Sequence, residues 1–173
     1  MSFEPVIGIE THVELNTKSK MFCGCSSVDS TIAQPNQFVC PICAGFPGTL
    51  PTTNSKAIEY GILISLALNC KINRLSIFSR KNYFYPDLPQ GYQISQHSHP
   101  LASQGSLTIQ SNTMTKMIRI RSVHLEEDAG KLIHSNPEAT LIDLNRAGIP
   151  LVELVSEPDL SNAEEAVSYA KEL

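Results

Sequence analysis

The segment Ile7-Gly8-Ile9-Glu10-Thr11-His12-Val13-Glu14-Leu15 nearly alternates apolar and polar side chains. Successive side chains of an extended strand point to opposite faces, so this spacing predicts a strand with one buried and one polar face. The buried face carries Ile7, Ile9, Val13 and Leu15, and the polar face carries Glu10, His12 and Glu14. Because Glu10 and His12 are two residues apart on one face, both side chains are directed at one point.

Four later segments are strand candidates, namely Ser106–Gln110, Met117–Leu125, Thr140–Asn145 and Pro150–Val155. Before them, Asn54 or Ser55 is a suitable cap for a helix that ends at Leu68 or Asn69. Apolar residues lie on nearly all sides of this helix, so we expect it to pack inside the domain. The order of elements predicts an α+β fold with a mostly antiparallel sheet.

The end of the chain begins a second helix. Ser161 and Glu164 have the spacing of a capping box, and the small or apolar residues that follow Ala163 form one helix face. The chain then stops at Leu173 without a glycine or asparagine to end the helix. We therefore expect residues 1–173 to form one domain that is the front part of a longer protein.

Composition excludes several classes of protein. Of the 173 residues, 42% are hydrophobic, and the net charge is −4, which favours a folded domain over global disorder. A mildly acidic chain is a poor nucleic-acid binder by itself, because that affinity depends on neutralising phosphates. The longest charge-free apolar run, Tyr60–Cys70, is too short for a membrane span. The N-terminus lacks the regions of a signal peptide, so we expect a cytoplasmic protein without disulfides.

Four of the five cysteines form two close pairs, Cys23-x-Cys25 and Cys40-x-x-Cys43. Thiolates bind zinc tetrahedrally, and short loops bring each pair within reach of one ion, so this spacing favours a structural zinc site. The first pair is closer than the usual spacing, and free thiols in a loop are the alternative. Cys70 stands apart and is expected to be a small core residue.

Carboxylates gather in two later segments. His124-Leu125-Glu126-Glu127-Asp128 contains three, and Glu153 interrupts the apolar run 151–155. A carboxylate in such a run is costly to bury without a partner. Mg²⁺ prefers oxygen ligands and keeps water ligands that phosphates can replace, so one ion would satisfy these groups. The expected ligands are Glu10, His12, Glu153 and one or both of Glu126 and Glu127.

The alternative is that Glu14, Glu126 and Asp128 are solvated surface acids. Basic side chains that could pair with phosphates are Arg80, Lys81, Lys131 and Arg146, although each could be ordinary surface charge. The aromatic residues of 83–92 could stack on a base, but such a run is more typical of a half-buried strand. The sequence has no glycine-rich phosphate loop, so a nucleotide would be held by metal and carboxylates.

Several longer strings resemble one family, the B subunits of the tRNA-dependent aspartyl/glutamyl-tRNA amidotransferases. The resemblance covers essentially the whole chain. The strings are Val6–Leu15, Pro47–Pro51, Arg80–Asp87, Gly91–Gln96, His124–Lys131, Asp143–Arg146 and Glu157–Asp159.

The resemblance implies a carbon–nitrogen ligase with glutamine as amido donor. In that family an A subunit releases ammonia from glutamine, and the heterotrimer is braced by a small C subunit. The B subunit uses ATP and Mg²⁺ to phosphorylate the side-chain carboxylate of Glu on misacylated tRNA-Gln, or of Asp on misacylated tRNA-Asn, and ammonia then displaces phosphate. By matching motif, the metal and kinase-site residues are Glu10, His12, Glu126, Glu127 and Glu153. The resemblance also implies that zinc occupies the cysteine positions in some members.

The resemblance further implies an antiparallel-sheet cradle of the glutamine synthetase/guanido kinase type. Family members are much longer, so residues 1–173 correspond to the N-terminal part of the catalytic cradle domain, without the helical and tRNA-binding tail domains. We therefore expect the isolated chain not to catalyse transamidation. Two other hypotheses stay open: a zinc-stabilised interaction module without catalysis, and a metal-dependent hydrolase built on Glu10 and His12.

Overall fold

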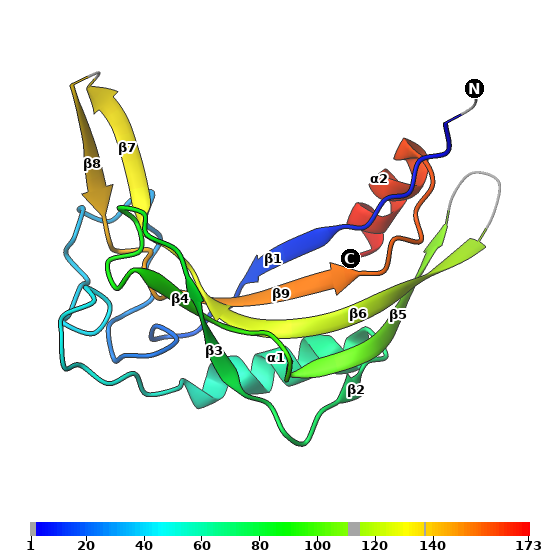
Figure 1. Cartoon of the computed structure of the whole chain (residues 1–173), viewed down its shortest axis with the longest axis horizontal. Coiled ribbons are helices and arrows are strands. Elements are labelled where there is room, and N and C mark those ends of the chain that lie inside the picture. Colours follow the sequence, from blue (N-terminus) through cyan, green and yellow to red (C-terminus); the bar gives the residue numbers. More distant parts are fainter. Residues whose placement is uncertain (1–2, 111–114, 137) are drawn as a thin grey trace.

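The computed structural model describes residues 3–110, 115–136 and 138–173 (Figure 1). Its centre is a curved antiparallel sheet of five strands. In spatial order these strands are β1 (Glu10–Glu14), β9 (Pro150–Ser156), β6 (Thr115–Glu127), β5 (Ala102–Gln110) and β2 (Lys71–Ile72). Two antiparallel ribbons pair β3 (Phe78–Asn82) with β4 (Tyr92–Gln96), and β7 (Lys131–Asn136) with β8 (Ala139–Asp143). The helices are α1 (Ser55–Ala67) and α2 (Ala163–Glu172).

The mixed α/β character and the antiparallel pairing agree with the sequence-based prediction. The four predicted strands correspond to β5, β6, β8 and β9, and the predicted helix after Asn54 is α1. Strands β3 and β4 were not among the predicted strands, and neither were β2 and β7. Strand β2 is very short, and β7 follows an Ala-Gly turn directly after β6, so neither of these two stands out in the pattern of the sequence.

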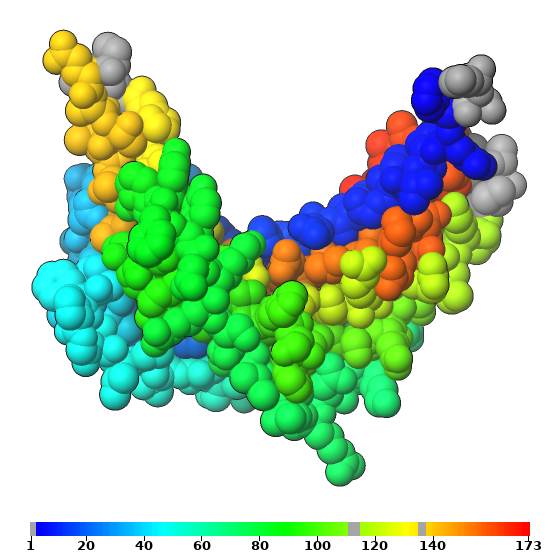
Figure 2. All heavy atoms as spheres, viewed as in Figure 1, coloured from blue at the N-terminus to red at the C-terminus, as the bar shows by residue number. Residues whose placement is uncertain are grey.

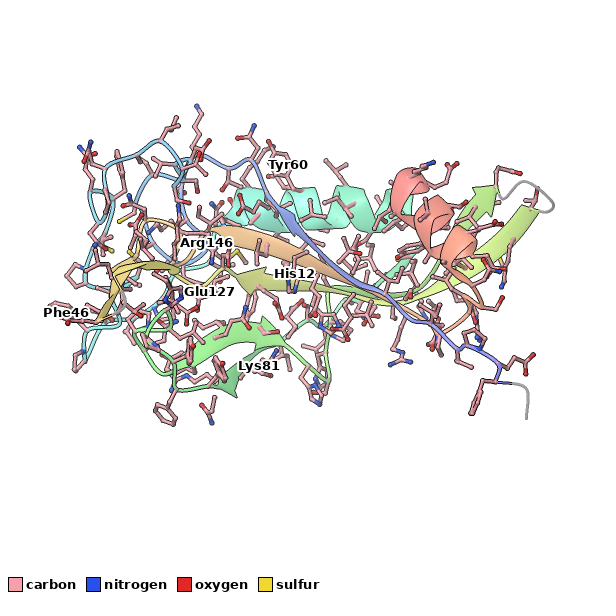
Figure 3. All side chains as sticks on the ribbon, turned by 90° about the horizontal axis from the view of Figure 1, so that it is seen from above. His12, Phe46, Tyr60, Lys81, Glu127 and Arg146 are labelled. Atoms are coloured by element: carbon pink, nitrogen blue, oxygen red, sulfur yellow. The ribbon has the colours of Figure 1, made fainter. Side chains whose placement is uncertain are left out.

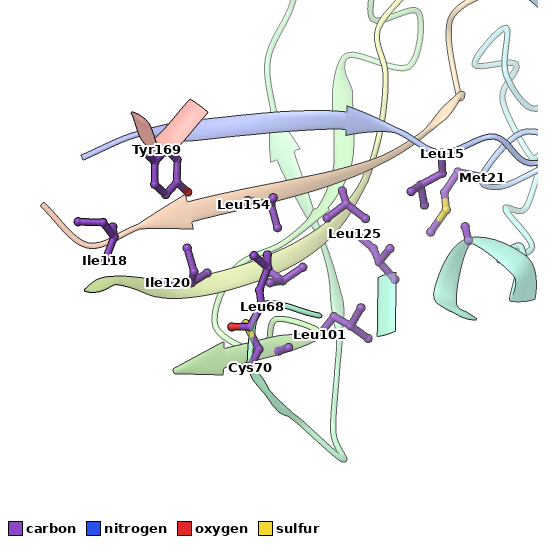
Figure 4. Packing of buried hydrophobic residues seen from close by; sticks show 14 of the residues in the cluster. Leu15, Met21, Leu68, Cys70, Leu101, Ile118, Ile120, Leu125, Leu154 and Tyr169 are labelled. Carbon is purple, nitrogen blue, oxygen red and sulfur yellow. The ribbon is translucent and has the colours of Figure 1, made fainter. Parts of the chain in front are cut away.

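The sheet has an apolar face and a polar face, as the alternation in β1 requires. Val13 on β1, Val152 on β9 and Leu125 on β6 are paired across neighbouring strands, and Val152 and Leu125 are completely buried or nearly so. Helix α1 covers this face, where Gly61 approaches Leu125 closely. Figure 4 shows the packing of this core around Leu125 and Leu154.

Helix α1 is less buried than its composition predicts. Only its small residues Ala57, Gly61 and Ser65 are fully buried, because they form the stripe that contacts the sheet. Leu63 and Leu66 on its outer face are 60% and 56% exposed. The expectation of a helix packed inside the domain was therefore wrong, since the sheet covers only one side of it.

The start of α2 also differs from the prediction. The N-cap is Asn162, whose side chain accepts a hydrogen bond from the backbone of Glu165. The carboxylate of Glu165, rather than that of Glu164, accepts from the backbone N–H of Ser161. The cap is thus shifted by one residue, and Glu165 also forms an ion pair with Lys116 at 2.8 Å.

The molecule is hollowed on the side opposite α1. Figure 2 shows a broad concavity between the β7–β8 ribbon at one end and the N-terminal segment at the other. The polar face of the sheet, which carries His12, forms the floor of this hollow, as the view from above shows (Figure 3). Within the described residues, neither helix combines the length and the hydrophobicity that crossing a bilayer would require.

Candidate functional site

Three strands of the sheet bring an imidazole and two carboxylates together on the polar face. His12 on β1 is paired with Glu153 on β9, and Glu126 lies on the neighbouring strand β6. The His12 Nε2 atom is 3.7 Å from Glu126 Oε2 and 3.6 Å from Glu153 Oε1. One ligand atom from each residue lies within 4.8 Å of the others, which is close enough for one metal ion. The segments that the sequence could not place therefore converge.

Glu126 is buried, so it is not the solvated surface acid of the alternative interpretation. Strand β4 crosses over this part of β6 and supplies its partners. The Ser95 hydroxyl donates to Glu126 Oε1, and Gln93 Nε2 donates to Oε2 at 3.3 Å. Burial raises the pKa of Glu153, and the neighbouring charge of Glu126 raises it further. A divalent cation would offset this repulsion between two carboxylates.

Two residues predicted for the same site lie outside this group. Glu10 is on the same face of β1, opposite Val155, and does not belong to the cluster of ligand atoms. Glu127 is also outside the cluster, and its Oε1 accepts from Gln90 Nε2 at 2.8 Å and from the Ile94 backbone at 3.0 Å. Burial raises the pKa of Glu127 to about 7. Its position connects the floor of the site with the cysteine loops.

Sequence reasoning did not select His124 or the residues of β4. His124 lies opposite Glu153, and its Nδ1 is 2.8 Å from the Gln96 carbonyl oxygen. The spacing of His124 and Glu126, two residues apart on one strand, was a usable signal, because Glu10 and His12 have the same spacing. Gln93 and Ser95 gave no such signal, since only the tertiary fold places the ribbon over β6.

The basic candidates differ in how they are used. Arg146 donates to the carbonyl oxygens of Ala129 and Gly130 at 3.0 and 2.9 Å, so it holds the turn that follows β6. Lys81 is exposed on β3, and Lys131 is partly exposed at the start of β7. Arg80 lies over the ring of Tyr92, 4.5 Å from its centre.

The aromatic run before β4 is more exposed than expected. Phe84 is 89% exposed, and the rings of Tyr83 and Tyr85 stack on each other 5.7 Å apart. The half-buried strand that was favoured for this run is therefore wrong. The run forms the turn between β3 and β4, in which the rings of Tyr83, Phe84 and Tyr85 stay largely exposed. Beside the ribbon is a cavity of about 300 Å³, lined by Phe46, Tyr92 and Glu127 among others.

The four paired cysteines converge as predicted. The Cys43 sulfur is 3.9 Å from the sulfurs of both Cys25 and Cys40. All four sulfurs, including that of Cys23, lie within 4.8 Å of one another. A tetrahedral site with zinc–sulfur bonds of about 2.3 Å requires sulfur–sulfur separations of about 3.8 Å. The donor set and its geometry therefore fit a zinc ion. Cys70 is buried in the core, as expected.

Buried polar residues hold the cysteine loops in position. The Asn145 side chain accepts from the Phe38 backbone at 2.9 Å and donates to the Gln34 carbonyl at 2.7 Å. Asp143 accepts from the Asn36 backbone at 2.9 Å. The end of β8 and the turn after it thus hold the segment that leads to Cys40.

Comparison with known proteins identifies the family to which the chain is related. Residues 5–173 match the family described as GatB/GatE catalytic domain. The chain is 53% identical over 173 residues to the B subunit of the aspartyl/glutamyl-tRNA(Asn/Gln) amidotransferase of Thermoanaerobacter sp. (strain X514). It is 55% identical over 173 residues to the protein of the same name from Persephonella marina.

A further relative, from Oleidesulfovibrio alaskensis, is 55% identical over 172 residues and has the same name. The matches cover 99–100% of this chain but 36% of each relative, so the chain spans about a third of their length. The family match covers nearly every residue, including both the polar face of the sheet and the cysteine loops. This chain therefore belongs to the GatB/GatE catalytic domain family.

Proposed function

We propose that this chain is the N-terminal part of the catalytic cradle of an amidotransferase B subunit, and that His12, Glu126 and Glu153 hold Mg²⁺ for an ATP-dependent step. The observation that carries the proposal is the convergence of these three side chains on the floor of the hollow. Family membership supplies the class of reaction. The cradle of the glutamine synthetase/guanido kinase type is part of the same proposal.

The proposed reaction has two steps. A side-chain carboxylate oxygen of Glu or Asp on misacylated tRNA attacks the γ-phosphorus of ATP, and ADP leaves. Ammonia from glutamine then attacks the acyl carbon, phosphate leaves, and an amide is formed. Mg²⁺ supplies charge neutralisation on the phosphates during the first step. The partners are the A and C subunits and the misacylated tRNA, in the cytoplasm.

The residues of this chain have distinct roles in that scheme. Glu126 and Glu153 provide anionic oxygen ligands, and Ser95 and Gln93 orient Glu126 through hydrogen bonds. Glu10 extends the anionic surface along β1, two residues before His12. Glu127 accepts a hydrogen bond from Gln90, whose backbone packs against Gly45 of the cysteine loops. Lys81 and Lys131 are the proposed contacts for phosphate, whereas Arg146 shapes the turn that precedes Lys131.

Metal binding by the chain tests the site directly. We expect titration with Mn²⁺, a paramagnetic substitute for Mg²⁺, to reveal one site by electron paramagnetic resonance, which added Mg²⁺ displaces. Substitutions Glu126→Gln and His12→Ala should weaken this binding, because each removes a ligand. The matched control is Glu14→Gln, since Glu14 is an exposed acid on the same strand. Equal binding by all four proteins would refute the site.

Activity needs the complete B subunit with its A and C partners. There, we expect ATP hydrolysis that depends on misacylated tRNA to be lost in Glu126→Ala and His12→Ala, while circular dichroism shows an intact fold. The chain of 173 residues alone should not convert Glu-tRNA-Gln. Conversion by this chain with the A and C subunits would overturn that expectation.

The cysteine cluster supports a second part of the proposal, a structural zinc ion bound by Cys23, Cys25, Cys40 and Cys43. Elemental analysis should find about one zinc per chain, and Cys40→Ser should lower that content. Full zinc content in that variant would exclude this ligand set. If zinc is present but Mn²⁺ does not bind, the zinc-stabilised interaction module becomes the better interpretation. Zinc bound at Glu10 and His12 instead would favour the hydrolase.

A further inference from the structure

Lys20 is a buried cation that the proposed reaction does not use. Its side chain has no solvent exposure. No carboxylate lies within ion-pair distance of it in the part of the chain that the structure describes. Transfer of an ammonium group from water to a protein interior costs several kcal/mol unless an anion or strong acceptors replace the water. The partners of Lys20 should therefore reveal why it is buried.

The Lys20 ammonium has two partners, and one of them is a cysteine sulfur. Its Nζ donates to Cys43 Sγ at 3.5 Å and to the Leu144 carbonyl oxygen at 3.1 Å. Cys43 is the most buried of the four clustered cysteines and is 7% exposed. A neutral thiol is a weak acceptor, whereas a thiolate is an anion. The burial of Lys20 is thus explained if Cys43 carries negative charge.

Lys20 also touches the other half of the cluster through its backbone. Its N–H donates to the Cys25 carbonyl oxygen at 2.9 Å. One residue therefore contacts both cysteine pairs, and through Leu144 it contacts the turn whose Asn145 holds the segment before Cys40. Gly148, with φ of +87°, passes next to the Lys20 stem, where a Cβ would lie 3.4 Å from it. The surroundings of Lys20 are built around its extended side chain.

We propose that Lys20 is a positioning residue of the cysteine metal site, whose ammonium neutralises part of the charge of the metal–thiolate cluster and fixes the Cys43 sulfur by an N–H···S hydrogen bond. This inference rests on the proposed zinc site. Four thiolates around one Zn²⁺ carry a net charge of −2, which is costly in a partly buried loop. Lys20 supplies the buried positive charge, and partners of this kind typically change metal affinity by about 10–100-fold.

The test compares the chain with Lys20→Met, which keeps most of the side-chain volume but loses the charge and the donor. Zinc affinity is measured by competition with a chromophoric chelator. We expect one zinc per chain in both proteins, with a dissociation constant raised about 10–100-fold in Lys20→Met. The matched control is Lys18→Met, because Lys18 is exposed in the same loop. It should bind zinc as the unsubstituted chain does.

Cobalt provides a signature that a merely structural role would not change. In the Co²⁺-loaded chain, a hydrogen bond to a thiolate lowers the energy of the sulfur electrons, so its loss in Lys20→Met should shift the sulfur-to-cobalt charge-transfer band to longer wavelength. If Lys20→Met does not fold, Lys20→Gln, which keeps an N–H donor without the charge, is measured in the same way and should also bind zinc more weakly.

The outcomes separate the two proposals. Absence of zinc from the unsubstituted chain would contradict the metal site itself. Zinc in the unsubstituted chain, with the same affinity in the Lys20 variants and an unshifted cobalt band, would leave the metal site standing and overturn the role of Lys20.

Discussion

At the scale of single residues, buried polar groups decide the geometry of the loops. Asn145 and Lys20 are both completely buried, and both are satisfied by groups that are distant in sequence. A buried donor or acceptor that loses its partner costs more than the hydrogen bond contributes net, so such residues select one loop conformation. Apolar residues could not do this, because their contacts are not directional.

Replacement of Asn145 by Ala should destabilise the fold by about 1–3 kcal/mol. The substitution leaves the Phe38 N–H and the Gln34 carbonyl without their partner. Urea unfolding followed by circular dichroism measures the change. Asn16→Ala, at an exposed position, is the control and should have little effect. Equal stability of the two variants would contradict the role given to Asn145.

The ion pair of Asp159 with Arg119 predicts a dependence on pH. Hydrogen bonds from the guanidinium, at 2.6 and 2.9 Å, lower the pKa of Asp159 to about 2 from 3.8. Between about pH 2 and pH 4 the unfolded chain therefore binds more protons than the folded chain. The contribution of the ion pair to the free energy of unfolding is complete above about pH 4 and is lost as the pH falls to about 2. Because Arg119 is largely exposed, we expect this contribution of the ion pair to be about 1 kcal/mol or less.

Asp159→Asn should remove that part of the acid sensitivity, which urea unfolding between about pH 2 and pH 6 measures. Glu4→Gln, at an exposed position outside the sheet, serves as the control. If Asp159→Asn and the unsubstituted chain lose stability in parallel over this range, the ion pair does not contribute.

At the scale of elements, the buried faces of β6 and α1 differ from those that a regular sequence pattern predicts. Ile118 and Ile120 share a face with Leu125, although even and odd positions of one regular strand should face opposite ways. The register shift between Ile120 and Ser122 changes the phase, and it lets β6 bury apolar residues on one side along its whole length. In α1 the small residues lie against the sheet, so the helix can approach closely.

Gly61→Val should destabilise the chain by about 1–3 kcal/mol through overpacking. A Cβ at this position would lie 2.7 Å from Leu101 Cδ2 and 2.9 Å from Leu125 Cδ2, and valine adds two further methyl groups. The midpoint of thermal unfolding measures the effect. Valine is a better helix former than glycine, so helix propensity does not oppose Gly61→Val. The control is Ala67→Val, which introduces valine at an exposed position of the same helix. A similar loss in both variants would show that the close approach is unimportant.

At the scale of the whole molecule, the cysteine loops and the β3–β4 ribbon enclose one end of the sheet. Gly45, with φ of +70°, packs so closely on the backbone of Gln90 that a Cβ would lie 2.6 Å from it. Gln90 in turn donates to Glu127, the neighbour of Glu126 in the chain. The cysteine loops therefore contact the floor of the hollow through Gln90 and Glu127.

The free energy of unfolding should depend on the free zinc concentration, because the proposed zinc ion binds the folded cysteine cluster. A ligand that binds only the folded state stabilises it by about 2.7 kcal/mol at a concentration 100-fold above its dissociation constant. We expect the unfolding midpoint of the chain to rise with buffered zinc, and Cys40→Ser to abolish this rise. An unfolding midpoint independent of zinc would contradict a structural metal. The Cys70→Ser variant is the control for loss of a thiol outside the cluster.

The sequence by itself determined the elements with strong periodicity, the convergence of the two cysteine pairs, and the family to which the chain belongs. The alternation in residues 7–15, the cap at Asn54 and the two Cys pairs depend on neighbours in the chain, and local geometry is enough to interpret them. Only the tertiary structure decided that Glu126, rather than Glu127, lies beside His12, that β4 covers this site, and that Lys20 contacts Cys43. These relations join residues far apart in sequence, and they depend on strand register and packing, which no local pattern specifies.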